Sequence, residues 1–325
     1  MKKIIVSRTD NLGDVVLTLP VAGLIKKYFP DVTLLFLGKS YTRPLLESCV
    51  HVDEFLDWDL LSADREASEK IRNLQADAVV HVFPVKEIAR LARKAGIPLR
   101  IGTSHRWYHW LNCNKLVHYS RKNSALHEAQ LNLKLLEPLG ITQSLTLKEI
   151  PAYYGLKVQA DRLPSAGGAM HLILHPKSKG SAREWGLDHY AQLVRLLPAE
   201  KFKIYITGTR EEGLMMKDLF AELGDRVSDM TGKFTLSELI RFIASCDALV
   251  AASTGPLHIA AALGKKTVGI YAPMRPIFPQ RWAPLGENAG YLSLDKKCKK
   301  CRGKKECECI RSITPQEVAS KLLTR

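Results

Sequence analysis

The sequence contains no long apolar run, and this absence excludes the simplest membrane architectures. No stretch approaches the roughly 18 apolar residues that a membrane-spanning helix needs. The beginning, MKKIIVSRTD, has no apolar core typical of a secretory signal, because charge returns at Arg8 and Asp10. With 46% hydrophobic and 25% charged residues, the 325-residue chain has the composition of a globular protein with a real core. We therefore expect a cytoplasmic protein.

Acidic residues are also scarce. Asp and Glu number 33 against 48 Lys and Arg, which gives a net charge of +15 and an isoelectric point near 9.5. Such an excess favours an anionic partner, such as nucleic acid, a phosphorylated lipid or a nucleotide-bearing substrate, although solubility alone can explain it. The charge is concentrated: residues 86–122 hold nine Lys and Arg against one Glu, and residues 296–311 hold eight against two.

Short apolar runs alternate with longer amphipathic segments along the chain. Runs such as KIIVS, TLLFLG, EFLDW and AVVHV predict buried strands, whereas DVVLTLPVAGLIKKYF and PVKEIARLARKAG have helical spacing. The pattern restarts after QADRLPSAGGAM, residues 159–170, which is typical of a linker. The last segment, TPQEVASKLLTR, predicts a helix with Thr314 as its N-cap. We expect two doubly wound α/β domains with ligand sites at the carboxyl ends of their strands.

The stretch RTDNLGDVVLTLP, residues 8–20, places a carboxylate where the first strand turns into a helix. Taken alone, Asp14 at this position favours a structural role as a helix cap that offsets the helix dipole. The same helix end would keep the carboxylate ionised, which is the state that a general base needs. Gly13 suits a backbone that a ligand approaches closely. Both roles of Asp14 stay open on this evidence.

Two loops in the second half of the chain collect hydrogen-bond donors. The loop in LHPKSKGSAREWGLDHY, residues 174–190, offers hydroxyl, amide and cationic donors suited to a diphosphate, although the P-loop spacing is missing. In ALVAASTGPLHIAAALG, residues 248–264, a strand turns into a helix whose first backbone N–H groups would point outward. A solvated loop and a structural histidine at His258 are the plainer alternatives.

Five motifs taken together resemble one family. RTDNLGDVVLTLP, HPKSKGSAREWGLDHY, DMTGKFTLSELI, STGPLHIAAALG and RWAPLG are similar, in order, to glycosyltransferase family 9, which includes ADP-heptose:lipopolysaccharide heptosyltransferases. The resemblance implies a GT-B fold of two Rossmann-like domains facing across a cleft. Residues 1–158 would bind the acceptor and residues 159–310 the nucleotide sugar, and a helix within 311–325 would pack back on the first domain. It also implies inverting transfer to the lipopolysaccharide inner core, with no cofactor needed for catalysis, at the inner face of the inner membrane.

The family's functional positions carry over onto named residues. The catalytic carboxylate falls on Asp14, which as general base would take the proton of the acceptor hydroxyl. The positions implied for binding the ADP-sugar are Gly13, Ser178, Arg183, Thr231, Gly232, Ser253, Thr254, Gly255 and His258, together with an acidic residue that falls on Glu211 or Glu212. Ser253 stands where the family motif often has Asp, which leaves the donor sugar open. As a hypothesis, contacts with an anionic acceptor or a membrane surface come from Arg90, Arg93, Arg100, Arg106 and Lys122.

Four of the seven cysteines lie in CKKCRGKKECEC, within residues 298–309. Cys298, Cys301, Cys307 and Cys309 could supply four thiolates to a structural zinc ion. The C-x-C step is tighter than the usual ligand spacing, so four neutral thiols are the alternative. Elemental analysis of the purified protein tests the prediction, and zinc-free protein would exclude the site.

Two alternatives remain beside an ADP-heptose-dependent enzyme. One is another GT-B glycosyltransferase that uses a different nucleotide sugar or glycan acceptor. The other belongs to a different class, a basic nucleic-acid-binding protein. No recognised nucleic-acid-binding module accompanies the basic charge, so the sequence favours the enzyme.

Overall fold

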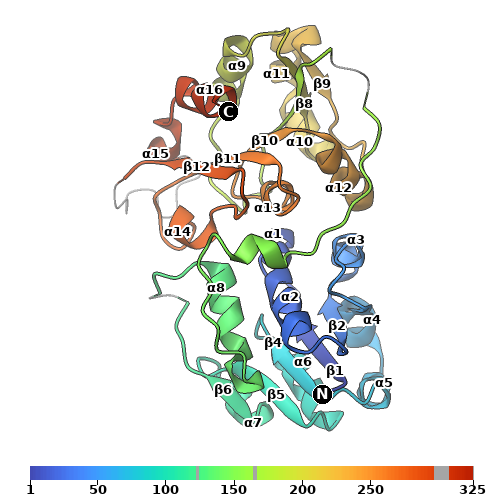
Figure 1. Ribbon diagram of the computed structural model, residues 1–325. Coiled ribbons are helices and arrows are strands. Elements are labelled where there is room, and N and C mark those ends of the chain that lie inside the picture. Colours follow the sequence, from blue (N-terminus) through green and yellow to red (C-terminus); the bar gives the residue numbers. More distant parts are fainter. Residues whose placement is uncertain (122–123, 164–166, 296–306, 325) are drawn as a thin grey trace. The chain divides into compact units, whose positions relative to one another are not determined.

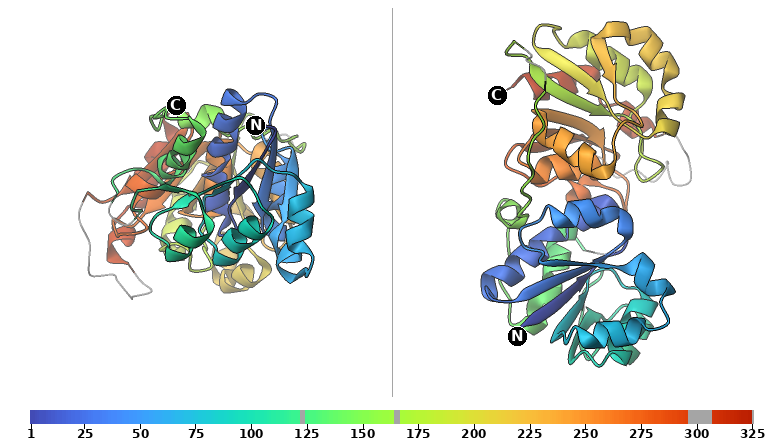
Figure 2. Two further views of the ribbon diagram at one scale, coloured as in Figure 1. Left: turned by 90° about the horizontal axis from the view of Figure 1, so that it is seen from below. Right: turned by 90° about the vertical axis from the view of Figure 1, so that its right-hand side faces the viewer.

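The computed structural model describes residues 1–121, 124–163, 167–295 and 307–324. The chain divides into two compact units, Met1–Lys157 and Val158–Arg325. This division lies one residue from the domain boundary that the sequence predicts. Each unit is built on its own parallel six-stranded sheet flanked by helices (Figures 1 and 2).

Unit 1 carries its six strands in the order β3-β2-β1-β4-β5-β6. The strands are β1 (Lys3–Ser7), β2 (Thr33–Gly38), β3 (Glu54–Asp57), β4 (Ala78–His81), β5 (Leu99–Thr103) and β6 (Lys115–Val117). The helices are α1 (Leu12–Val16), α2 (Leu19–Tyr28), α3 (Arg43–Glu47), α4 (Trp58–Ala63), α5 (Ala67–Asn73), α6 (Lys86–Lys94), α7 (Trp107–Asn112) and α8 (Glu128–Leu133), with 3-10 turns η1 (Ser40–Thr42), η2 (Lys134–Leu139) and η3 (Ile150–Tyr153). The central strands β1 and β4 carry apolar runs at residues 4–6 and 78–80, as expected where helices cover both faces of a parallel sheet.

Unit 2 carries its strands in the order β12-β11-β10-β7-β8-β9. The strands are β7 (Met170–His175), β8 (Phe202–Ile206), β9 (Val227–Asp229), β10 (Ala248–Ala252), β11 (Lys266–Tyr271) and β12 (Ala289–Ser293). The helices are α9 (Leu187–Leu196), α10 (Arg210–Met215), α11 (Lys217–Leu223), α12 (Leu236–Ser245), α13 (Gly255–Ala262), α14 (Pro279–Trp282), α15 (Glu308–Arg311) and α16 (Pro315–Leu323), with the 3-10 turn η4 (Gly224–Arg226).

Both sheets have the same topology. Counted from the first strand of each unit, the order is 3-2-1-4-5-6, which is the doubly wound Rossmann arrangement. The winding reverses between β1 and β4 in unit 1 and between β7 and β10 in unit 2. Ligands of such sheets bind outside the carboxyl ends of the strands at this switch point. The loops after β1, β4, β7 and β10 are therefore the places to look for a site.

The first helical segment is broken in two, although its sequence predicts a single helix. α1 ends at Val16 and α2 begins at Leu19. Pro20, in the first turn of α2, has no N–H to donate, and its ring would clash with the carbonyl four residues earlier. The hydroxyl of Thr18 donates instead to Asp14 O at 2.8 Å. The break leaves α1 as a short helix that carries Asp14.

The C-terminal helix α16 packs on unit 2, so the prediction that it returns to the first domain is wrong. Val318 and Leu322 are buried in the core of unit 2, and Figure 1 shows α16 beside α9. The Trp185 indole N–H donates to the carbonyl of Ile313, the residue before the N-cap of α16, at 2.8 Å. Thr314 is its N-cap, as predicted, and accepts from the backbone N–H three residues on. The apolar face of α16 finds its partner within the same unit.

Candidate active site

The residue directly after β1 is a buried arginine, Arg8, with 2% of its surface exposed. Its Nε donates to Asp10 Oδ1 at 2.6 Å, and its Nη2 donates to Asp10 Oδ2 at 2.9 Å and also to the Asp14 carboxylate. Its Nη1 donates to Glu128 Oε1 at 3.3 Å and to Asn132 Oδ1 at 3.2 Å. One guanidinium therefore joins the loop after β1, helix α1 and helix α8. Arg8 is not among the site residues predicted from the sequence.

A second arginine completes this charged cluster. Arg121 donates from Nε to Glu128 Oε1 at 3.0 Å, and from Nη2 to Asn132 Oδ1 at 3.1 Å and Val82 O at 2.9 Å. Val82 directly follows β4, so the cluster lies at the switch point of unit 1. Together with Arg8, it sets two guanidiniums against three carboxylates. The pairing of opposite charges offsets the free-energy cost of burying them.

Asp14 belongs to this cluster and is not the helix cap. Its side chain is 13% exposed, and the N-cap of α1 is Asn11. Burial raises the pKa of Asp14 to about 6; the Arg8 guanidinium opposes the rise, and the charges of Asp10 and Glu128 add to it. A carboxyl group with a pKa of about 6 is ionised at neutral pH, but burial and neighbouring charges, rather than a helix end, account for the shift. Gly13 lies inside α1, directly before Asp14.

In unit 2, the loop after β7 is held by its own side chains. The backbone N–H of Ser178 donates to Glu184 Oε1 at 3.1 Å, and its Oγ lies 3.2 Å from both that oxygen and Ala182 O. Lys177, which the sequence analysis passed over, donates to Glu184 Oε2 at 2.5 Å. The structure thus places the predicted phosphate ligand Ser178 in the internal bonding of the loop. Arg183 comes from the same loop and is partly exposed.

The start of α10 separates the two glutamates between which the sequence could not choose. Glu212 is 6% exposed; its Oε2 accepts from Thr209 N at 2.8 Å and its Oε1 accepts from Lys179 N at 3.2 Å. It therefore caps α10 and ties that helix to the loop after β7. Glu211 is exposed, and hydrogen bonds from its own N–H and the Thr209 side chain lower its pKa.

The TGK turn packs against the same helix. Gly232 N donates to Gly208 O at 2.9 Å, one residue before the N-cap of α10. A Cβ on Gly213 would lie 2.2 Å from Thr231 Oγ1, so only glycine allows this contact. Thr231 and Gly232 therefore pack against the start of α10, the helix that carries Glu211.

The turn between β10 and α13 has the features of an anion site. Thr254 is the N-cap of α13 but makes no capping hydrogen bond with its side chain. It is 5% exposed, and its hydroxyl has no hydrogen-bond partner among the described residues. The first backbone N–H groups of a helix also lack partners inside the helix. Gly255 opens the helix, His258 is buried one turn in, and the Ser253 hydroxyl hydrogen-bonds Tyr271.

Comparison with known proteins decides the family. The family model for glycosyltransferase family 9 (heptosyltransferase) matches residues 65–310. The chain belongs to glycosyltransferase family 9. It is therefore a glycosyltransferase, as its motifs predicted. Because the match begins after Asp14, the role of that residue rests on its own geometry.

Relatives of this family 9 chain extend over nearly its whole length. It is 26% identical over 325 residues to lipooligosaccharide heptosyltransferase 2 of Campylobacter jejuni, covering 97% of this chain and 96% of that one. It is 23% identical over 342 residues to lipopolysaccharide heptosyltransferase 2 of Escherichia coli K12, covering 98% and 97%. The solved structure of E. coli ADP-heptose lps heptosyltransferase II is similar with a TM-score of 0.77 at 21% identity, covering 99% and 97%. The predicted GT-B fold is confirmed.

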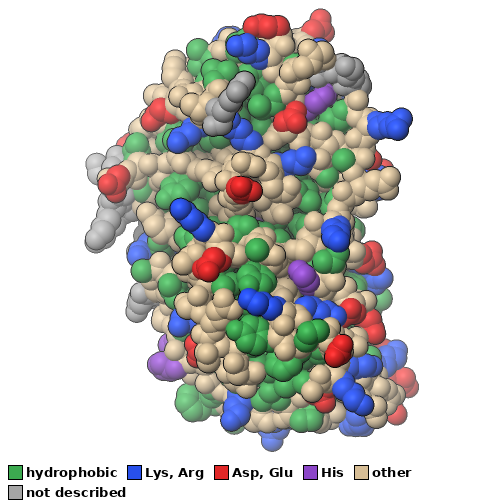
Figure 3. Space-filling view, in the orientation of Figure 1, with side chains coloured by type: hydrophobic (Ala, Val, Ile, Leu, Met, Phe, Trp, Pro, Cys, Tyr) green, Lys and Arg blue, Asp and Glu red, His purple; other side chains and the backbone are tan. Residues whose placement is uncertain are grey.

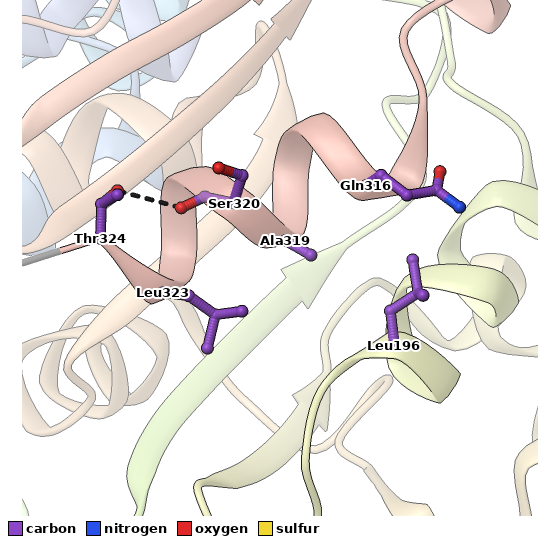
Figure 4. Close-up of a pocket in the computed structure, with 6 residues that line it drawn as sticks. All are labelled: Leu196, Gln316, Ala319, Ser320, Leu323 and Thr324. Carbon is purple, nitrogen blue, oxygen red and sulfur yellow. Dashed lines mark hydrogen bonds between the residues drawn. The ribbon is translucent and has the colours of Figure 1, made fainter.

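One hollow in unit 2 of this family 9 enzyme lies away from these motifs. It has a volume of about 440 Å³ and lies between α9 and α16 (Figure 4). Its lining residues are Leu196, Gln316, Ala319, Ser320, Leu323 and Thr324. The lining contains no charged side chain and none of the predicted donor residues. It therefore offers no cationic side chain to a diphosphate.

The basic residues predicted to bind the acceptor fall into two groups. Arg93 Nη1 donates to Leu111 O at 2.6 Å, and Arg100 Nε donates to Asn112 O at 2.7 Å, so both hold backbone in place. Arg90 and Arg106 are exposed, and Lys122 lies outside the described residues. On the face shown in Figure 3, basic side chains are interspersed with acidic ones.

The predicted zinc ligands are also divided. Cys298 and Cys301 lie outside the described residues. Cys307 and Cys309 are 1% and 3% exposed and belong to the core of unit 2. Among the residues that the structure describes, no group of three or more His, Cys, Asp or Glu could hold a metal ion. The four-cysteine zinc site stays a prediction.

Proposed function

We propose that this glycosyltransferase moves heptose from ADP-heptose onto the inner core of lipopolysaccharide, with inversion at the anomeric carbon and Asp14 as general base. The observation that carries the proposal is the carboxylate of Asp14, which lies at the switch point of unit 1 and is held by Arg8. Burial raises its pKa to about 6, so it is ionised at neutral pH and still basic enough to accept a proton. The names of the relatives support the donor and the acceptor.

The reaction is a single displacement. Asp14 takes the proton of an acceptor hydroxyl while that oxygen forms a bond to the anomeric carbon. The bond between this carbon and the diphosphate breaks, and ADP leaves with the electron pair, so the configuration inverts. The Arg8 cluster carries one net negative charge when its three carboxylates are ionised, and it becomes neutral as Asp14 is protonated. A negative cluster also suits the positive charge that develops on the sugar.

Unit 2 provides the groups that bind the departing ADP. The first N–H groups of α13 and the Thr254 hydroxyl meet the diphosphate, and Arg183 contributes a cation from the loop after β7. Glu211, the exposed member of its pair, contacts the ribose side of the nucleotide. These groups stabilise the negative charge that develops on the departing diphosphate, so the proposed reaction needs no metal ion. Ser253 offers the sugar a hydrogen bond without a charge.

The proposed acceptor is part of a membrane lipid, so the enzyme would meet it at a membrane surface. Lipopolysaccharide core is built on a lipid and carries phosphates and acidic sugars, which suits a chain with a net charge of +15. Peripheral association with the cytoplasmic face of the inner membrane is therefore part of the proposal. Arg90 and Arg106 are exposed and available for such contacts.

A thermal-shift series tests the donor site. We expect ADP and ADP-heptose to raise the Tm of the wild-type protein, with roughly 2.7 kcal/mol of added stability at about 100 times the Kd. Thr254→Val should weaken ADP binding by about tenfold or more, because a hydrogen bond to a charged group is lost. Its Tm without ligand should not fall, since the hydroxyl has no partner to lose.

Thr267→Val is the matched control. The Thr267 hydroxyl is also buried and without a partner among the described residues, but it lies in β11. This variant should bind ADP as the wild type does. If only UDP- or GDP-sugars raise the Tm, the protein is still a glycosyltransferase but its donor is not ADP-heptose. Equal loss of ADP affinity in both variants would remove Thr254 from the site.

A further inference from the structure

The exposed side of α7 is apolar, which is uncommon for a short surface helix. Trp107, Trp110 and Leu111 are 64%, 64% and 60% exposed. Their i, i+3, i+4 spacing puts them on one face of the helix. In the described part of the chain, no other helix carries three large hydrophobic side chains this exposed on one face. Single exposed hydrophobic residues are ordinary, but an adjacent group of three suggests a surface with a partner.

This face is held rigidly by the other side of the helix. The Tyr108 hydroxyl donates to Pro84 O at 2.8 Å, and His109 is fully buried. The indole N–H of Trp110 donates to Ser104 O at 2.8 Å, so the polar atom of that ring is satisfied within the protein. The part of the Trp110 ring that is exposed to solvent is therefore apolar. The exposure of α7 is therefore a property of the folded unit and not of a loose segment.

A basic stripe runs beside the apolar face. Lys86, Arg90 and Arg93 follow i, i+4, i+7 spacing on α6, which puts them on one side of that helix. Lys86 Nζ lies 5.1 Å from the ring centre of Trp107, at the start of α7. Arg93 Nη1 donates to Leu111 O at 2.6 Å, near its end. The basic stripe therefore lies beside α7 along the whole length of that helix.

We infer that the basic-aromatic face of unit 1, formed by Lys86, Arg90, Arg93, Trp107, Trp110 and Leu111, binds the surface of an anionic lipid bilayer. Indole rings partition into the headgroup region of bilayers, and neighbouring Lys and Arg pair with lipid phosphates. In the part of the chain that the structure describes, no helix is long and apolar enough to span a membrane, so this contact is an interfacial one.

The size of the face favours a bilayer over another protein. A stable protein interface buries roughly 800 Å² on each partner, which three apolar side chains on a six-residue helix do not supply. A lipid surface needs no matching shape, because its headgroups rearrange around the inserted rings. The inference fits the proposed acceptor, but the binding needs neither donor nor acceptor and is measured without them.

Vesicle co-sedimentation tests the inference. We expect the wild-type protein to sediment with vesicles of phosphatidylcholine and phosphatidylglycerol, and to bind pure phosphatidylcholine more weakly. Added salt should weaken the first interaction because it screens the basic stripe. Trp107→Ala/Trp110→Ala should lower the affinity at least about tenfold, because the insertion of two indole rings is lost. Lipids brominated near the headgroup should quench the tryptophan fluorescence of the wild type but not of this variant.

Leu214→Ala/Met215→Ala is the control variant, since these side chains are 59% and 65% exposed but lie on α10. It should bind the vesicles as the wild type does. The inference is overturned if the wild type does not bind anionic vesicles, or if the tryptophan variant binds them unchanged. It is also overturned if the wild type is a dimer in solution and the tryptophan variant a monomer, because the face would then join two copies. Any of these results would leave the proposed transfer reaction standing, although a wild type that does not bind anionic vesicles would also remove the proposed peripheral membrane association.

Discussion

Asp14→Asn should lower kcat by about 10²–10⁴-fold, because the proton of the acceptor hydroxyl loses its base. The amide keeps the size of the carboxylate, and it still accepts a hydrogen bond from Arg8. Binding of ADP should be unchanged, since the proposed donor groups lie in unit 2. The measurement is steady-state transfer to lipopolysaccharide core, with ADP binding followed separately by calorimetry.

The pH profile identifies the base more directly than the loss of activity does. In the wild type, kcat/KM should fall with unit slope as the pH drops below about 6, because burial raises the pKa of Asp14 to that value. The residual activity of Asp14→Asn should lack this acid limb. A limb that persists unchanged in the variant would assign the titration to another group.

Asp10→Asn is the matched control, because Asp10 is a carboxylate bonded to the same guanidinium. Its negative charge helps to raise the pKa of Asp14. The variant should therefore keep most of the activity and move the acid limb to lower pH. If it loses as much activity as Asp14→Asn, the two residues act together and the single-base mechanism is wrong.

Arg8→Met should be the most destabilising of these changes, at about 3–5 kcal/mol, because it removes one of the two guanidiniums that pair with three carboxylates in the cluster. Glu128 and Asp14 are 1% and 13% exposed, so water compensates little. Urea unfolding at neutral pH measures the loss. Glu128→Gln in the same chain should restore part of it, since one of the uncompensated charges is then gone.

The pH dependence of this loss has a definite sign. Without Arg8, the influence that lowers the pKa of Asp14 is removed, so its folded-state pKa rises above about 6. A carboxyl group whose pKa is higher in the folded state contributes stability at low pH and loses it as the pH rises. The deficit of Arg8→Met should therefore be smaller at pH 5 than at pH 8. Constant loss across this range would mean that packing, rather than charge, is what Arg8 supplies.

Arg195→Met provides the comparison on the surface. Arg195 pairs with Glu222, but the two side chains are 59% and 42% exposed. Exposed pairs of this kind contribute about 0–1 kcal/mol, because water screens them. A loss as large as that of Arg8→Met would show that the assay does not separate buried from exposed ion pairs.

The sequence by itself determined the architecture and the places of the loops that carry the motifs. Apolar runs such as KIIVS predict strands buried on both faces, and helical segments between them require parallel, doubly wound sheets. Since strands end where such runs end, the loops at Asp14, Thr254 and Glu211 could be assigned to the carboxyl edges. The positions of these strands and helices follow from residues that are neighbours in the sequence.

Some errors of the sequence analysis came from contacts between elements. The amphipathic pattern of α16 predicts that one face is buried but does not say against what; α9 supplies that surface. For Glu212, the capping-box spacing with Thr209 is a local signal for the bond from Thr209 N, but no local pattern predicts the second bond, from Lys179 N. The exposure of Trp107 and Trp110 on α7 likewise depends on the fold, because the sequence does not show which side of a helix other elements cover.

Only the tertiary structure decided the chemistry of Asp14. Its pKa depends on desolvation and on Arg8, Asp10 and Glu128, and the Arg8–Glu128 contact joins residues 120 positions apart. The charged residue that directly follows a buried strand is a signal that could have pointed to Arg8. Its partners could not be read in the same way, because no local pattern records which side chain of a distant helix meets a buried charge. Electrostatic free energies are set by neighbours in space, whereas strands and helices are set largely by neighbours in sequence.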